Sequence, residues 1–542
     1  MKHLFSAAVI FSVFFIGCKK EDSQSSTSGP GSGIIINTDP AALAGRVQTN
    51  GLGVIDFNSG VTDGRLMGDS VASNQYPMEL VATALPPTSG NTTLRATHVD
   101  INGNYAYVSY NMEGNDYLGG IDVFSINDAS KPKLVSSVII PFTDISAVTY
   151  FNNRLYIAGA SDVNKVKNTV NPGLIGWLEY INGIPTGRFQ FNYFPGEVAT
   201  GITVSGNKVL ATVGANGSFL SLDPLSLQQQ KAITVKDLRS VTANNDHVAL
   251  LSGSEGIGIY SKSDFSFIRN LSIAPDVAGA KRTMEFYDKY LLVAGGRKGV
   301  LYFDVNAGTK VGSVDLPVTL PSGIDASDVV TNAVSVNNKL FFAANGAAGT
   351  YVFNEKENHS LQLLGSIGLS GSANYVKSKD NFLFVASGKQ GLSIIKFTQP
   401  ASSANSCSGL PPYTGSANFN VNGNENLQYG GSVALQNVNV NAALYYCGSM
   451  TVSENLQVNG NGIMEMHGTL AVGKNRSKSL TINNKGTLKI EGDLVIYGDL
   501  RLNEGSTLQF IGDNSTITIH GNVVKDKDVN IIGTFTDVSD KL

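Results

Sequence analysis

The chain has 542 residues, enough for two or three domains of roughly 100–200 residues each. Its 59 glycines, about 11 % of the chain against a usual ~7 %, and its charged fraction of 15 % against ~25 % exclude helical bundles and coiled coils. The net charge of −4, with no basic block after the first twenty residues, excludes a nucleic-acid-binding surface, and 42 % hydrophobic residues exclude wholesale disorder. We therefore expect a large all-β protein.

The chain begins with a short basic segment followed by an apolar run, Leu4–Ile16, that is too short to span a bilayer as a mature helix. The run ends at Gly17-Cys18 and resembles the lipobox of bacterial lipoproteins, in which the cysteine is acylated and becomes the new N-terminus. Phe15 departs from the leucine expected three residues before the cysteine. We expect a signal peptide over 1–18 and lipidation of Cys18; an ordinary signal peptide is the alternative.

A flexible tether is expected over 19–43, because the segment after Cys18 is rich in Ser, Gly and Thr. It begins with Lys19-Lys20-Glu21-Asp22, which resembles the surface-export signal of Bacteroidetes lipoproteins. This resemblance implies a protein held in the outer membrane by the lipid on Cys18 and exposed on the cell surface.

Residues 44–400 contain a repeating unit of four short strands separated by turns. In the clearest copy, His98–Ile101, Tyr105–Val108, Ile121–Phe124 and Leu134–Ile140 are β-branched or alternating segments. A turn rich in Asn, Asp and Gly followed by a strand recurs seven times, about 39–54 residues apart, which is close to the length of a four-stranded propeller blade. The repeats predict a seven-bladed β-propeller with four-stranded antiparallel blades.

The last copy stops after its third strand, near Pro400, and lacks a fourth. Pro77–Leu85, before the first copy, has the pattern of an outer strand without a blade of its own. We expect this N-terminal strand to complete the last blade and so close the ring, which removes two exposed sheet edges. Six or eight blades would follow if the long second unit or Gly53–Phe57 were misread.

The glycine-rich segments Gly119–Val135 and Gly391–Phe397 resemble the repeats of LVIVD-repeat β-propellers of bacterial surface and secreted proteins. The resemblance covers about 350 residues and is weaker in the middle copies. It implies a propeller but no activity, because propellers carry many unrelated functions. In the second copy, Ser161–Ile184 is longer than a blade loop requires and contains Trp177 and Tyr180, so it is a candidate protein-contact loop, with packing over a blade edge as the alternative.

A second domain is expected over 418–542, after a linker of Ser, Pro and Gly over 401–417. Glycines recur every six residues at Gly486, Gly492 and Gly498, each followed by a short alternating strand. This spacing predicts a smaller β-solenoid and resembles the rungs of bactofilin-like and other parallel β-helix proteins; a β-sandwich is the alternative. A hexapeptide acyltransferase is disfavoured, because no active-site pattern surrounds His467 or His520.

Two cysteines remain after Cys18, and they lie in the linker and in the second domain. Outside the cytoplasm, Cys407 and Cys447 could form a disulfide that fastens the linker to the solenoid; two separate thiols are the alternative. The six histidines are never paired at metal-ligand spacing, and the sequence has no HExxH or CxxC motif, so we expect no metal centre of that kind.

A ligand site is expected at the mouth of the propeller channel, where the loops leading into the innermost strands converge. These loops supply acids and bases that could hold a cation, a sugar or a basic peptide. The alternative is that these loops are polar because they are solvated. The candidate residues are Arg95, His98, Asp144, Glu197, Asp237, Arg239, Arg282 and Asp328, with Lys281 and Asn374 beside them.

We therefore expect a lipid-anchored protein of the cell surface that presents the propeller for interaction with a protein or a glycan, or that serves as a scaffold. It is expected to be monomeric, to need no cofactor and to bind no nucleic acid. Catalysis is not indicated by any motif, and no residue is assigned a catalytic role. The alternative is a propeller hydrolase or lactonase that uses Ca²⁺ held by carboxylates in the central channel.

Overall fold

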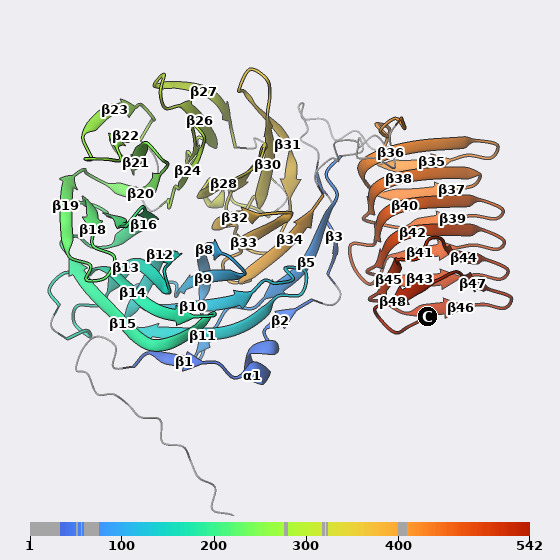
Figure 1. Cartoon of the computed structure of the whole chain (residues 1–542), viewed down its shortest axis with the longest axis horizontal. Coiled ribbons are helices and arrows are strands. Elements are labelled where there is room, and N and C mark those ends of the chain that lie inside the picture. Colours follow the sequence, from blue (N-terminus) through green and yellow to red (C-terminus); the bar gives the residue numbers. More distant parts are fainter. Residues whose placement is uncertain are drawn as a thin grey trace, which may run out of the picture.

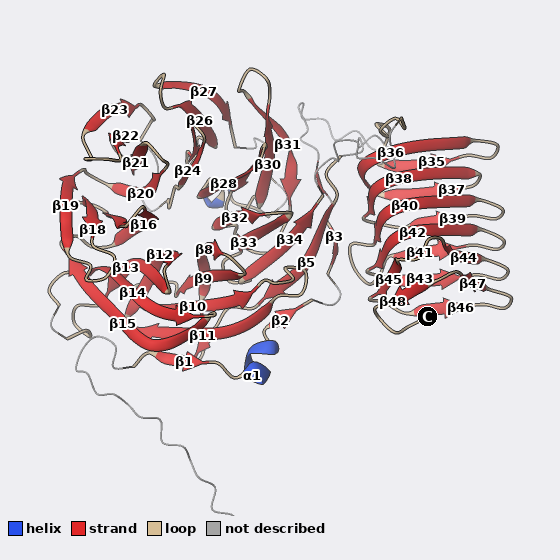
Figure 2. Ribbon diagram, in the orientation of Figure 1, coloured by secondary structure: helices blue, strands red, loops and turns tan. Residues whose placement is uncertain are grey.

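A computed structural model of the chain describes residues 33–49, 52–55, 57–58, 75–167, 169–275, 280–316, 320, 323–398 and 409–542. These residues fold into a β-propeller and a separate β-solenoid (Figure 1). Strands make up almost all of the regular structure, as Figure 2 shows. None of the helices in the described ranges is long and apolar enough to cross a membrane.

The propeller has seven blades, each a four-stranded antiparallel sheet, as predicted. The innermost strands β8, β12, β16, β20, β24, β28 and β32 surround the centre (Figure 1). The first three blades are formed by β8 (Arg95–Asn102), β9 (Tyr105–Asn111), β10 (Leu118–Ser125) and β11 (Lys133–Pro141); β12 (Thr143–Phe151), β13 (Arg154–Ser161), β14 (Gly173–Ile181) and β15 (Ile184–Phe194); and β16 (Ala199–Ser205), β17 (Lys208–Val213), β18 (Ser218–Leu222) and β19 (Gln229–Thr234).

The next three blades repeat this order, and a two-stranded hairpin, β6 (Thr88–Ser89) with β7 (Thr92–Thr93), precedes the first blade. Apolar side chains of adjacent blades pack against each other in shared clusters, which stabilises the ring. The three blades are formed by β20 (Leu238–Ala243), β21 (His247–Ser252), β22 (Gly256–Ser261) and β23 (Phe267–Leu271); β24 (Met284–Tyr287), β25 (Tyr290–Ala294), β26 (Val300–Asp304) and β27 (Thr309–Val314); and β28 (Ala333–Asn337), β29 (Leu340–Ala344), β30 (Thr350–Glu355), β31 (Leu361–Ile367) and the added β4 (Phe57–Asn58).

The first hairpin turn of several blades uses the backbone conformation that its sequence predicts. Asn153, Asp288, Asn338 and Asp380 have φ of 60°, 54°, 53° and 51°, in the left-handed region. Asn and Asp tolerate this region better than β-branched or bulky residues, so they favour the tight connection between the first two strands. The recurring turn therefore fixes how the first two strands connect in these four blades.

An N-terminal strand closes the ring, as predicted. The seventh blade consists of β32 (Tyr375–Lys379), β33 (Phe382–Ala386) and β34 (Leu392–Phe397), and its outer strand is β5 (Met78–Ala84). The strand β5 pairs antiparallel with β34 and also with the short strands β2 (Val47–Gln48) and β3 (Gly53–Val54). The last blade is therefore joined to the first through the chain that connects β5 to β8.

Residues 33–43, which the sequence predicts as part of a flexible tether, are ordered on the first blade. Their strand β1 (Ile35–Asn37) pairs with β11, and helix α1 (Pro40–Ala44) buries Leu43 in the propeller core. Just beyond, the guanidinium of Arg46 forms an ion pair with the buried carboxylate of Asp122. Residues 33–43 therefore belong to the propeller rather than to a tether.

The predicted contact loop Ser161–Ile184 is not an insertion. Its second half contains β14, the third strand of the second blade, which pairs with β13 and β15. Trp177 is 7 % exposed and donates its indole hydrogen to the Leu225 carbonyl, while Tyr180 is fully buried. The aromatic residues that suggested a recognition loop therefore belong to the core, which corrects that prediction.

The second domain is a parallel β-solenoid, and the β-sandwich alternative is excluded by the parallel pairing of its strands. One sheet stacks short strands, and the other stacks longer strands that form the remaining sides of each turn (Figure 1). The short strands are β35 (Asn418–Val421), β37 (Asn437–Val440), β39 (Leu456–Val458), β41 (Ser479–Ile482), β43 (Asp499–Leu502) and β46 (Val523–Lys525). The other sheet contains β36 (Asn426–Leu435), β38 (Ala443–Val452), β40 (Ile463–Val472), β42 (Thr487–Ile496), β44 (Thr507–Phe510), β45 (Ser515–Ile519), β47 (Asn530–Ile532) and β48 (Phe535–Asp537).

A column of glycines runs through the long strands of the solenoid. Gly431, Gly448, Gly468 and Gly492 are direct neighbours in the register, and all four have positive φ, between 93° and 139°. The predicted six-residue spacing arises because Gly492 stands between two four-residue faces of β42, and each face buries two apolar side chains. Glycine is required here because a Cβ on Gly468 would lie 2.1 Å from the Gly448 carbonyl oxygen.

Both ends of the solenoid core are covered by aromatic side chains. At the first turn, Tyr413 packs on Phe419 with ring centroids 4.3 Å apart, and at the last turn Phe535 stacks on Phe510 at 4.2 Å. Tyr413 belongs to the segment predicted as a linker, so the described part of that linker packs on the solenoid. Cys447 is buried on β38 and is a disulfide cysteine, while Cys407 lies outside the described residues, so the pairing of these two cysteines stays a prediction.

Substitution of Gly468 by Ala is expected to lower the free energy of unfolding of the solenoid by about 2–4 kcal/mol, because the Cβ requires both a strained φ and a displaced neighbouring turn. The matched control is Gly423→Ala, since Gly423 has open space around it and φ outside the left-handed region. Chemical denaturation followed by circular dichroism measures both. Equal stability of the two variants would contradict the packing described for the glycine column.

Candidate functional site

The mouth of the propeller channel is bridged by one lysine side chain. Lys281 comes from the segment before β24, and its amine donates hydrogen bonds to the carbonyl oxygens of Thr97 and Ser146 in the first two blades. The same amine lies 5.1 Å from the ring centroid of Tyr375 in the seventh blade. Lys281 therefore connects four blades across the axis, and burial lowers the pKa of its amine to about 7.

His98, which lies on the innermost strand β8 rather than in a loop, is beside Lys281. Its ring packs on Tyr375 with centroids 3.9 Å apart, and the side chain is buried. Burial, and next the charges of Lys281 and Lys377, hold the pKa of His98 well below its usual range. The imidazole is therefore neutral at physiological pH, in a position where cations already crowd the axis.

Further along the axis, residues two positions from His98 and Tyr375 form a second group. Lys377 forms an ion pair with Glu285 at 3.1 Å, and this carboxylate is the main cause of the raised pKa of Lys377. Asp100 accepts a hydrogen bond from the Tyr150 amide at 2.7 Å, and burial raises its pKa. These contacts connect innermost strands of different blades, which stabilises the ring from within.

The acids predicted at the mouth are divided between separate partners. Asp144 accepts a hydrogen bond from the Leu118 amide at 3.1 Å, and burial raises its pKa to about 6. Asp237 pairs with Arg239 at 2.6 Å on the fourth blade. Arg95, at the start of the innermost strand β8, pairs at 2.8 Å with Glu113 of the loop between β9 and β10. These contacts hold loops and strands in place rather than gather the carboxylates around one pocket.

The other predicted mouth residues have separate locations. Arg282 is 2 % exposed and donates from Nε to the Ala294 carbonyl. Glu197 is exposed on a loop, and Asp328 is exposed at the end of the short 3₁₀ helix η1 (Ala326–Asp328). Asn374 donates to the Ala96 carbonyl at 2.9 Å and so joins the last blade to the first. Among the residues that the structure describes, no three His, Cys, Asp or Glu side chains are grouped so that they could hold a metal ion.

The propeller and the solenoid contact each other through β3 and β5. The Val54 amide donates to the Gly473 carbonyl at 3.0 Å, and Val54 packs with Ala471 and Tyr497 in one buried cluster. The hydroxyl of Tyr497 donates to the carboxylate of Glu79 at 2.8 Å, and this contact is buried. Gly53 lies so close that a Cβ there would meet the Lys474 backbone at 2.4 Å.

Beside this contact, the two domains enclose a cleft of about 470 Å³, which we call the interdomain cleft. The propeller lines it with residues of β5 and β34, the residue after β2 and the loop between β10 and β11. The solenoid lines it with residues of β42 and β45, with the loops that follow β40, β42 and β45, and with the C-terminal segment. Its basic lining residues are Lys131, Lys396, Arg476 and Lys541.

An aromatic pair forms the floor of the interdomain cleft. His520 stacks on Tyr497, with ring centroids 4.9 Å apart and an interplanar angle of 3°. Burial, followed by the charges of Lys541, Arg476 and Lys131, lowers the pKa of His520. Positive charges from both domains therefore act on the same ring.

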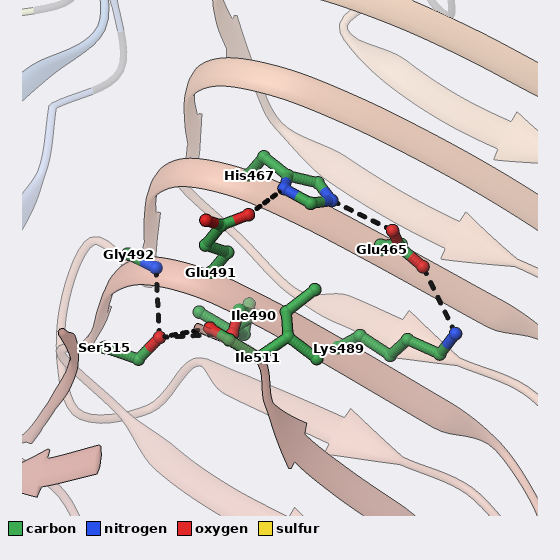
Figure 3. A network of polar contacts seen from close by, with 8 residues as sticks. All are labelled: Glu465, His467, Lys489, Ile490, Glu491, Gly492, Ile511 and Ser515. Atoms are coloured by element: carbon green, nitrogen blue, oxygen red, sulfur yellow. Dashed lines mark hydrogen bonds and ion pairs between the residues drawn. The ribbon is translucent and has the colours of Figure 1, made fainter. Parts of the chain in front are cut away.

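The solenoid also carries a polar network around His467 (Figure 3). One ring nitrogen contacts Glu491 and the other contacts Glu465 at 2.9 Å, and Glu465 in turn pairs with Lys489 at 3.2 Å. These residues stand on the adjacent strands β40 and β42, so the network connects neighbouring turns. Because carboxylates engage both ring nitrogens, neither nitrogen is available as a general base.

The sequence brings Lys281 and His98 together near the propeller axis but gives no indication of the interdomain cleft. Two pairs of residues on innermost strands are two positions apart: His98 with Asp100, and Tyr375 with Lys377. Because residues two apart on a strand face the same side, this spacing is a usable signal for side chains that face the axis. The four basic residues of the cleft lie far apart in the sequence, in two domains, and no regular spacing relates them: Lys131, Lys396, Arg476 and Lys541. Only the arrangement of the domains brings them together.

Comparison with known proteins identifies no family. No protein-family model matches the chain, and no curated protein matches it. Among solved structures, the computationally designed Ika8 protein is 11 % identical with a TM-score of 0.37, covering 58 % of this chain and 99 % of its own. A chain of the mitotic checkpoint complex is 10 % identical with a TM-score of 0.40, covering 72 % of this chain and 99 % of its own.

Substitution of Lys281 by Met is expected to remove a pH dependence of stability above neutral pH. The pKa of this amine is about 7 in the folded protein, whereas an unfolded lysine has a pKa of ~10.4. Between these values the unfolded chain holds one more proton, so the stability of the native protein rises with pH by up to about 1.4 kcal/mol per pH unit. Urea unfolding at several pH values in this range measures the effect.

The control is Lys339→Met, which removes an exposed lysine from the turn between β28 and β29. Its stability should follow the same pH dependence as the native chain, while the curve of Lys281→Met should be flatter. Parallel curves for the native chain and Lys281→Met would show that the amine titrates as it does in water, contrary to the burial described.

Proposed function

We propose that this protein is a lipid-anchored binding protein of the outer membrane, exposed on the cell surface, which presents the propeller and the solenoid for interaction with a glycan. The acylated Cys18 is the anchor in this proposal. The apolar leader that ends at Gly17-Cys18 and the polar segment that follows it support the location.

The observation that carries the binding function is the interdomain cleft. It has two walls from different domains, and a buried hydrogen bond and an apolar cluster hold these walls together. Ligand pockets occur preferentially at domain interfaces, and the volume of about 470 Å³ falls within their usual range. The propeller channel, by contrast, is bridged by Lys281 and braced by paired side chains.

The calcium-dependent hydrolase that the sequence left open has less support. Such an enzyme requires two or three carboxylates around one pocket. Asp144, Asp237 and Glu113 are each engaged with a different partner, on different blades or loops. No observation in the described part of the chain favours hydrolysis, so binding is the function proposed.

Substitution of Cys18 by Ser is expected to abolish acylation, because the hydroxyl does not replace the thiol as acceptor. The protein should then be lost from the outer-membrane fraction, whereas the native chain should stay there and be digested by protease added to intact cells. Fractionation and labelling with a radioactive fatty acid measure this. Retention of the Cys18→Ser protein in the outer membrane would contradict the anchoring proposed.

Incubation of the full chain with an array of immobilised glycans is expected to show saturable binding to a subset of them. The Gly53→Val variant is expected to bind less, because the added side chain pushes the Lys474 backbone away and distorts the cleft. Binding measured by fluorescence on the same array compares the two. Equal binding by both would contradict a site between the domains, and binding by neither would contradict glycan recognition.

A further inference from the structure

The interdomain cleft gathers positive charge in a chain whose net charge is −4. Lys131 and Lys396 come from the propeller, and Arg476 and Lys541 come from the solenoid. Among the described lining residues there is one carboxylate, that of Glu79, and it accepts the hydroxyl hydrogen of Tyr497. Four basic side chains around one space repel each other, and an anion placed among them would remove that repulsion.

Several basic side chains elsewhere on the solenoid are paired with carboxylates. Lys478 pairs with Glu454 at 2.5 Å, and Arg501 pairs with Asp499 at 3.4 Å. Within the described ranges no carboxylate forms an ion pair with Lys131, Lys396 or Arg476. The cations of the cleft therefore retain their capacity to bind an anion.

These charges converge on one place. Lys131, Arg476 and Lys541 all act on His520, although Lys131 belongs to the first blade and the others to the solenoid. Lys541 is held there because its amine donates to the carbonyl oxygens of His520 and Gly521, at 3.0 and 2.6 Å. An anion beside His520 would thus be within reach of cations from both domains.

The remaining lining fits the rest of a sugar molecule. Val538, which lines the cleft and is exposed, provides apolar surface for its C–H groups. Hydroxyl side chains, which can exchange hydrogen bonds with sugar hydroxyls, also line the cleft: Thr49, Ser130, Thr518 and Ser539. The volume of about 470 Å³ suits one or two sugar residues.

We infer that the interdomain cleft binds an anionic sugar, a saccharide residue that carries a carboxylate, sulfate or phosphate group. The anionic group lies between Arg476 and the lysines, and the sugar hydroxyls face the hydroxyl side chains. This inference rests on the proposed binding function and names the class of its ligand.

Isothermal titration calorimetry of the full chain tests it with glucuronic acid, glucose 6-phosphate, glucose, inorganic phosphate and inorganic sulfate. Glucuronic acid or glucose 6-phosphate should bind with an affinity that falls as salt is added, and glucose should bind at least about tenfold more weakly, because it lacks the charged group. Inorganic ions that bind as tightly as the anionic sugars would overturn the assignment of a saccharide.

The informative variant is Lys131→Gln with Arg476→Gln, which removes one exposed cation from each wall of the cleft. We expect at least about a tenfold loss of affinity for the anionic sugar, since two charge-assisted contacts are lost. The matched control is Lys133→Gln with Lys485→Gln, which makes the same change in net charge at exposed residues outside the cleft. Equal loss in both double variants would overturn the cleft as the site.

The two proposals fail in different ways. If the Lys131→Gln, Arg476→Gln chain binds the glycan array as well as the native chain does, the anion site is wrong and the binding function stands. If the native chain binds neither the array nor the anionic sugars, the binding function itself is wrong. Circular dichroism spectra identical to that of the native chain confirm that the variant is folded.

Discussion

The strand β5 is the element on which both the propeller and the interdomain cleft depend. It completes the seventh blade by pairing with β34, and it also pairs with β2 and β3. Its side chains serve both sides of the strand: Met78 is buried in the core of the last blades, while Glu79 contacts the solenoid through Tyr497 and Val81 lines the cleft. Ring closure and domain contact are thus set by the register of one strand.

That register includes an irregularity between Ile394 and Ile395 of β34, opposite Ala82 and Leu80 of β5. Val81 is therefore the extra residue on β5, and a bulge of this kind re-aims side chains along a strand. This bulge, together with the close approach that Gly53 allows, places the outer edge of the seventh blade against the solenoid. The cleft lies at this edge, so its two walls are held by backbone contacts rather than by surface ion pairs alone.

Much of the fold follows from local sequence signals. In four blades an Asn or Asp marks the first turn, because few other residues adopt the left-handed backbone conformation there: Asn153, Asp288, Asn338 and Asp380. The six-residue glycine spacing marks the solenoid because a Cβ at Gly468 or Gly492 would meet the turn stacked beneath it. Ring closure by β5 was predictable from a counting argument, since the last repeat has three strands and the first is preceded by one more.

Other features have no local signal. Trp177 was predicted to be in a loop because the second blade has long strands, and length alone does not distinguish β14 from an insertion. Residues 33–43 are an exception, because Ile34, Ile35, Ile36 and Leu43 are apolar where the rest of the predicted tether is polar; β1 adds to the edge of the first blade and α1 buries Leu43. The interdomain cleft depends on the placement of two domains, which is decided by contacts between residues as distant as Glu79 and Tyr497.

Hydrogen exchange at the Val54 amide tests most directly whether the propeller and the solenoid form one unit. This amide donates to the Gly473 carbonyl, and Val54 is 3 % exposed. In the native chain it should exchange far more slowly than an amide in an unfolded peptide, and the protection should be lost in Gly53→Val, where the side chain forces Lys474 away. Fast exchange of the Val54 amide in the native chain would show that the domains move independently and would contradict a cleft built by both.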